Sequence, residues 1–277
     1  MLYLDWQIEP VLIGLITTLG VAYYLSVGPL RQRLAPGKPY PTQRALVFGL
    51  GLVLLFLIEG SPLHDLAERY LLSAHMIQHL LLTYIVAPLL LAGTPAWLLR
   101  ASLANKTMYP IMRVLLHPLT TFAAFAVVMY VYHLPRIYDL SLINTSLHHG
   151  VHVIILFASL MLWWPTLSPL PELPRPPYII RLAYLFLVPV AQLPIFAGIT
   201  FAHEPLYQMY ANMPTRAFGL SVMEDQAIAG VIMKVFGVVA FGIPFIATFF
   251  SWYRSELSAG RPPQGGTGTT AELKTQA

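Results

Sequence analysis

The chain has 277 residues, of which 57% are hydrophobic and only 10% are charged. Because soluble domains carry about 25% charged residues, this composition indicates an integral membrane protein. The formal net charge of +4 does not indicate nucleic-acid binding, since the basic residues stand beside apolar stretches, where they orient membrane helices. The chain contains no cysteine, which excludes disulfides, thiolate metal sites and cysteine nucleophiles.

A helix that spans a bilayer needs about 20 predominantly apolar residues. Seven stretches approach this length and predict an all-α integral membrane protein, a seven transmembrane helix bundle within residues 1–254. In chain order they are Pro10–Val27, Gln43–Ile58, Leu71–Leu91, Pro118–Val131, His149–Trp164, Ile180–Thr200 and Ala227–Trp252. Residues 255–277 are rich in Gly, Thr and Pro and are predicted to form a disordered tail.

Lysine and arginine are distributed unequally between the two sides of this predicted bundle. Twelve follow the first, third, fifth and seventh helices, whereas only Arg69, Arg136 and Arg216 fall on the opposite side. Cytoplasmic loops are enriched in these residues, so the N-terminus is predicted to lie outside and the C-terminal tail in the cytoplasm. Trp163 and Trp164 then fall at a cytoplasmic helix end, which is typical of an interfacial aromatic belt.

Eight of the nine histidines fall in the outer half of the predicted bundle. His75 and His79 lie in the first turns of the third helix, and His148 and His152 lie in the first turns of the fifth. Residues four positions apart share a helix face, and the second of each pair lies about 6 Å deeper. Since short loops join helices three, four and five, we expect the two pairs to meet at one depth.

The chemistry of these side chains indicates a metal or cofactor site. Neutral imidazole binds copper, zinc and iron, and ionisable groups within membrane helices are usually functional. His149 stands at the same helix start, and His133 reaches the same level from the fourth helix. A proton relay is the alternative, because histidine titrates near neutrality. A polar cap or hydrogen-bonded role is the favoured interpretation for the remaining three, His64, His117 and His203.

The seventh helix carries two charged positions of interest. Asp225, near its start, is interpreted as a metal ligand, as a partner that orients a histidine, or as a helix cap. Lys234 lies about 13 Å further along, where a charge needs a partner or water. Glu59 and Asp225 are the candidate partners, and extension of the lysine side chain toward the outer face is the alternative.

An ordered series of motifs over about residues 45–253 resembles the CtaG family of cytochrome c oxidase assembly proteins. The motifs are His75-Met-Ile-Gln-His79, Ala87-Pro88, Gly93-Thr-Pro95, His117-Pro118, His133-Leu-Pro-Arg-Ile-Tyr-Asp139, His148-His149-x-x-His152, Trp163-Trp164-Pro165, Pro205-Leu-Tyr207 and Asp225-Gln226-Ala-Ile-Ala-Gly230. The resemblance implies a multi-pass protein of the bacterial plasma membrane that is not an enzyme and supports copper delivery to a haem–copper oxidase. The implied partners are oxidase subunits, an external copper donor and the lipid bilayer. Lys234 departs from the pattern, which has an aromatic residue there.

The family's role, joined to side-chain chemistry, suggests a set of copper ligands: His75, His79, His133, His148, His149, His152 and Asp225. Two other functions stay open. Paired histidines on neighbouring helices are also compatible with a haem- or diiron-binding membrane oxidoreductase. A scaffold for oxidase subunits would use the same histidines as polar packing, without a metal.

Overall fold

The computed structural model describes residues 4–103, 108–173, 175–215 and 217–259, and these residues form helices and loops without a strand. The prediction of an all-α protein is confirmed. The helices of the first half are α1 (Pro10–Val27), α2 (Arg31–Leu34), α3 (Thr42–Gly60), α4 (Pro62–Arg69), α5 (Leu72–Leu81), the π-helical turn η1 (Leu82–Val86), α6 (Ala87–Gly93), α7 (Ala96–Leu103) and α8 (Met108–Leu115). Those of the second half are α9 (Pro118–Tyr132), α10 (Pro135–Ile143), α11 (Thr145–Leu167), α12 (Tyr178–Ala191), α13 (Leu193–Thr200), α14 (Gln208–Ala211) and α15 (Val222–Ala259).

Within the described residues, six helical segments are long and apolar enough to cross a membrane. They are α1, α3, α5 through α6, α11, α12 through α13, and α15. The fourth predicted span, Pro118–Val131, forms α9, whose 15 residues are too few to cross a membrane alone. It reaches spanning length only together with α8, which is bent from it by 64°, so the bundle has six or seven spans.

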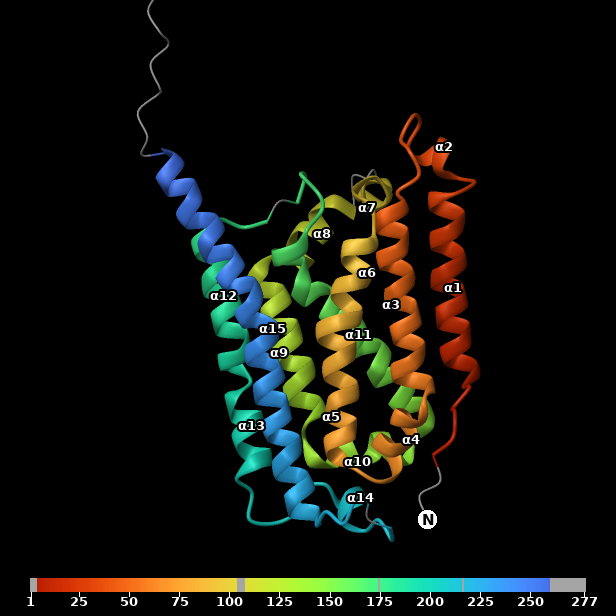
Figure 1. Ribbon diagram of the computed structural model, residues 1–277, viewed down its shortest axis with the longest axis vertical. Helices are drawn as coiled ribbons and strands as arrows, with labels where there is room; N and C mark the ends of the chain where they lie inside the picture. Colours follow the sequence, from red (N-terminus) through yellow and green to blue (C-terminus); the bar gives the residue numbers. More distant parts are fainter. Residues whose placement is uncertain (1–3, 104–107, 174, 216, 260–277) are drawn as a thin grey trace, which may run out of the picture.

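The spans run side by side, and the first described residues lie at the opposite end from the end of α15 (Figure 1). The short helices α4, α10 and α14 cover the end at which α1 begins, and α2, α7 and α8 lie at the other (Figure 1). We call the first of these the α4 end. Helix α15 continues to Ala259, so the first residues of the predicted tail are helical, and residues 260–277 lie outside the described residues.

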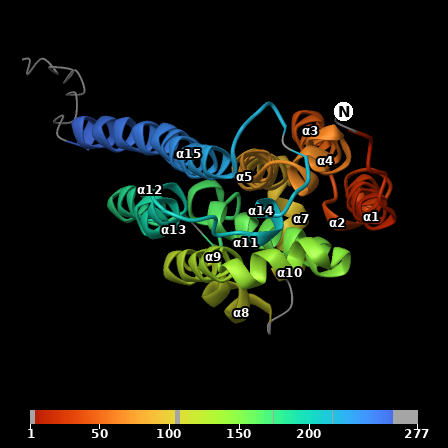
Figure 2. The same cartoon turned by 90° about the horizontal axis from the view of Figure 1, so that it is seen from below.

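Two segments form the centre of the bundle. In the α5–α6 span 67% of the residues in the most apolar window are buried, and in α11 61% are buried, against 17–28% in the other four spans. The α5–α6 span packs against α3, α11 and α15, and Figure 2 shows α5 between α15 on one side and α3 and α4 on the other. The exposed Leu, Ile, Val and Phe side chains of the outer helices form the apolar surface that a bilayer requires.

The central span contains a π-helical turn next to Pro88. In this turn the amide of Ala87 donates to the carbonyl of Leu82, five residues earlier. The same pattern would pair the Thr83 carbonyl with residue 88, but proline has no N–H to donate. The indole Nε1 of Trp163 supplies the missing donor at 2.8 Å. Trp163 and Trp164 are therefore buried core residues, and their assignment to an interfacial belt was wrong.

Candidate metal centre

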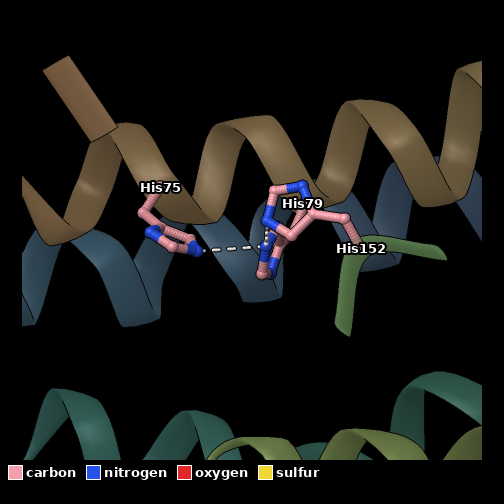
Figure 3. A group of neighbouring side chains, drawn as sticks. All are labelled: His75, His79 and His152. Atoms are coloured by element: carbon pink, nitrogen blue, oxygen red, sulfur yellow. Dashed lines mark hydrogen bonds between the residues drawn. The ribbon is translucent and has the colours of Figure 1, made fainter. Parts of the chain in front are cut away.

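Three histidine side chains converge inside the α4 end of the bundle. His75 and His79 project from the same side of α5, and His152 reaches them from α11 (Figure 3). The Nε2 atom of His79 lies 3.0 Å from Nε2 of His75 and 2.9 Å from Nε2 of His152. The three side chains are buried, with exposed fractions of 0–7%. We call them the triple-histidine group.

The two contributing helices begin where they do because of specific caps. Asn144 accepts a hydrogen bond from the amide of Leu147, so α11 starts at Thr145 and its histidines fall in the first two turns. Helix α5 is capped from another helix, because the carboxylate of Asp225 on α15 accepts from the amides of Leu72 at 2.7 Å and Ser73 at 3.1 Å. Asp225 thus fixes the turn that precedes His75.

Hydrogen bonds at the far ring nitrogens determine which nitrogen faces the centre of the group. Nδ1 of His152 lies 2.6 Å from Oε2 of Glu59, so Nδ1 carries the proton and donates it to the carboxylate. The hydroxyl of Tyr210 donates to the carbonyl of Ala67, and Nδ1 of His75 lies 3.0 Å from that hydroxyl oxygen. Nδ1 of His75 is therefore a donor as well, and both Nε2 atoms present lone pairs.

The three Nε2 atoms of the triple-histidine group therefore have at most one proton among them, on His79. His79 can donate that proton to only one of its two neighbouring nitrogens, and the hydroxyl of Tyr132, 3.1 Å from Nε2 of His75, can donate to that nitrogen. Tetrahedral ligands at about 2.05 Å from a metal would be roughly 3.4 Å apart. The two separations that involve His79 come within a few tenths of an ångström of that spacing, and all three ligand atoms lie within 4.8 Å of one another, so the group could hold one small metal ion.

A second group lies beside the first and combines His64 and Glu68 of α4 with His148 of α11. Oε1 of Glu68 lies 3.3 Å from Nε2 of His64 and 2.8 Å from Nε2 of His148. The ring centroids of His148 and His152 are 4.2 Å apart, so the two groups adjoin. We call this second set the Glu68 group.

The environment of the Glu68 group sets its protonation. Partial burial raises the pKa of the Glu68 carboxyl, but the neighbouring rings of His148 and His64 outweigh burial and lower this pKa to about 2. Burial lowers the pKa of His64, although the charges of Glu68 and Glu59 oppose this. At neutral pH an ionised carboxylate therefore faces a neutral His64 imidazole.

Three of the predicted ligands lie outside both groups. His133 ends α9, where Nδ1 donates to the carbonyl of Met129 at 2.7 Å. His149 lines a pocket between α1, α3 and α11 whose wall also includes Glu59, His64 and His152. Asp225 caps α5, as described above. The pocket therefore borders one residue of each group, His152 and His64.

Sequence reasoning missed four residues of this centre. His64 and Glu68 share one face of α4, and their i, i+4 spacing is a signal that a search restricted to long apolar helices does not consider. Glu59 stands at the end of α3 and bonds His152, not Lys234. Tyr210 comes from the short helix α14, far along the chain, and carries no such signal. Lys234 forms no ion pair within the described part of the chain and lines a pocket with Gln192.

Comparison with known proteins assigns the chain to a family. It is 25% identical over 271 residues to an uncharacterized protein of Mycobacterium leprae (strain TN), an alignment that covers 91% of this chain. The chain spans 40% of the length of that curated relative. No solved structure matches the chain. The family model for the cytochrome c oxidase caa3 assembly factor matches residues 21–255, most of the sequence, and the chain therefore belongs to this family.

Proposed function

We propose that this protein supports assembly of cytochrome c oxidase in a bacterial plasma membrane by holding copper in the triple-histidine group and passing it on. The observation that carries the proposal is the convergence of three Nε2 atoms that share at most one proton. Replacing that proton by a metal ion would satisfy all three lone pairs. In this proposal copper is cargo, and the protein itself catalyses no reaction.

The donor set supports a site for transient binding. Imidazole suits copper, and copper(II) forms the most stable complexes among the divalent first-row metals. Three ligands leave a coordination position open, as in metal sites that exchange a fourth ligand. A donor or an oxidase subunit can therefore take part in ligand exchange without unfolding of the site.

The proposed orientation follows from the distribution of basic residues. The loops at the α4 end contain few lysine and arginine residues. The positive-inside rule therefore assigns this end to the outside of the membrane. A metal centre at this end would meet an external copper donor and the oxidase on the same membrane face. The side pocket lined by His149 and His152 would give the ion access to the buried rings.

A haem-binding function has less support from the same geometry. Two axial imidazoles on a haem iron need a nitrogen separation of about 4 Å, twice a metal–nitrogen bond of about 2.0 Å, with a porphyrin between them. The Nε2 atom of His79 is only 2.9–3.0 Å from those of His75 and His152, and packed side chains such as Tyr132 lie against its ring.

Copper binding to detergent-purified protein tests the proposal. The chain should bind copper when titrated with Cu(I) in competition with a chelator, or with Cu²⁺, and the double variant His75→Ala/His79→Ala should lose one equivalent. His203→Ala, which removes an exposed loop histidine, is the matched control and should bind as the original chain does. Unchanged copper affinity in the double variant would refute the site.

The scaffold alternative is tested in cells. Cells that carry the double variant should contain oxidase with reduced copper content, measured on the isolated enzyme, while the variant protein is present at normal abundance. A pure scaffold predicts normal copper content in the oxidase, since its contacts do not need the Nε2 atoms of these histidines.

A further inference from the structure

The Glu68 group contains a buried side chain whose hydrogen bonds are unmade. Both ring nitrogens of His148 are buried without a hydrogen-bond partner, and only 1% of the residue is exposed. Its Nε2 atom is 2.8 Å from Oε1 of Glu68, close but not aligned as a hydrogen bond. Leaving a buried polar group in this state is unfavourable, so its persistence calls for a ligand.

We propose that His64, Glu68 and His148 form a second metal site, which takes a divalent cation such as Cu²⁺ beside the triple-histidine group. Their ligand atoms lie within 4.8 Å of one another. Two imidazoles and one carboxylate with an open fourth position are a donor set that proteins use for zinc, and copper(II) binds the same ligand types more tightly.

The imidazole of His64 must change its tautomer before all three residues can bind one cation. The amide nitrogen of Gln78 lies 2.7 Å from Nδ1 of His64 and donates to it, so the proton of His64 sits on Nε2 and points to Glu68. Cation binding moves this proton to Nδ1 and frees Nε2. The Oε1 atom of Gln78 is buried without a partner, and a half-turn of the amide brings it to accept from Nδ1, at the loss of the bonds that the amide nitrogen donates to the Ile58 carbonyl and to Glu59.

The second site lies where it could bind a metal ion between the side pocket and the triple-histidine group. The side chain of Glu68 is 30% exposed, whereas the residues of the triple-histidine group are at most 7% exposed. His64 lines the side pocket, and the ring of His148 stacks near that of His152. The site itself is argued from its own donors, but its role in passing cargo to the triple-histidine group rests on the proposed function.

Stoichiometry of Cu²⁺ binding tests the second site. Full-length protein in detergent should bind two Cu²⁺ per chain by equilibrium dialysis and metal analysis. His148→Ala and the near-isosteric Glu68→Gln should each bind one, and His75→Ala/His79→Ala should also bind one. Glu204→Gln, an exposed carboxylate in a loop after α13, should still bind two. Thermal melting of each variant identifies any that fail to fold.

Paramagnetic resonance gives an independent readout. Two adjacent Cu²⁺ ions broaden each other's signals, and the Glu68→Gln signal should narrow to that of an isolated ion. The second site alone would be overturned if both the His148→Ala and the Glu68→Gln protein bound two ions. It would also be overturned if the original chain bound one ion and both variants retained it. Loss of both ions in the His75→Ala/His79→Ala protein would overturn its independence. If the original chain bound no copper, the proposed function would be refuted together with the second site.

Discussion

The candidate site depends on single residues that hydrogen-bond to the far nitrogens of its imidazole rings. His152 and His75 direct Nε2 to the centre only because Glu59 and Tyr210 accept from their Nδ1 atoms. The i, i+4 spacing predicts that His75 and His79 share a face, but no spacing predicts which nitrogen is protonated. That choice is made by partners on α3 and in the segment before α15.

The residue-scale prediction concerns Glu59. Glu59→Gln keeps the shape of the side chain, but a neutral amide is a weaker acceptor for His152 Nδ1–H and permits the wrong tautomer. Changing such an outer partner lowers metal affinity by about 10- to 100-fold. Copper affinity measured against a competing chelator should fall within this range, with stoichiometry retained.

Glu204→Gln provides the matched control for that measurement, since it makes the same chemical change on an exposed loop. Equal affinities for the Glu59→Gln protein and the original chain would show that Glu59 does not tune the triple-histidine group.

At the element scale, α5 is positioned by other helices more than by its own sequence. Its first amides are capped by Asp225 of α15, and its π-helical turn is completed by Trp163 of α11. Close packing on α3 adds to this, because a Cβ atom at Gly93 would lie 2.5 Å from the backbone nitrogen of Phe48. The face of α5 that carries His75 and His79 is therefore positioned by three neighbouring helices.

The element-scale prediction separates a cap from a ligand at position 225. Asp225→Ala leaves two buried amides of α5 without acceptors and should destabilise the fold by on the order of 2 kcal/mol. Its melting temperature should fall and its copper affinity should weaken, but binding should persist at high copper concentration because the three histidine ligands remain.

Ser168→Ala is a control of the same kind, because the Ser168 hydroxyl, which follows the end of α11 remote from the histidines, accepts from the buried amide of Leu170. It should lower the melting temperature without changing copper affinity. Complete loss of one copper equivalent in Asp225→Asn, which keeps an acceptor oxygen, would instead make Asp225 a ligand.

At the scale of the whole molecule, the charge distribution and the position of the metal centre predict a single orientation. Both sites lie at the α4 end, and the basic loops lie at the other. The absence of cysteine makes this directly measurable, since a single introduced thiol is the only one in the chain.

His203→Cys at the α4 end should react with a membrane-impermeant maleimide in intact cells, and Lys38→Cys at the opposite end should react only after the cells are opened. Both positions are exposed, so accessibility within the protein does not distinguish them. The reverse labelling pattern would place the triple-histidine group on the cytoplasmic side and exclude delivery from an external donor.

The sequence alone determined the helical class, the extent of most spans and the pairing of His75 with His79, because apolar length and helical periodicity are local properties. It also carried the family resemblance. The helical spacing also predicted that His148 and His152 would approach that pair, but only the folded chain shows that His152 contacts His79, that Asp225 caps α5, and that His64 and Glu68 form a group with His148. The physical reason is that tautomers, caps and ligand sets depend on atoms that packing brings together from distant positions, and no local pattern encodes those contacts.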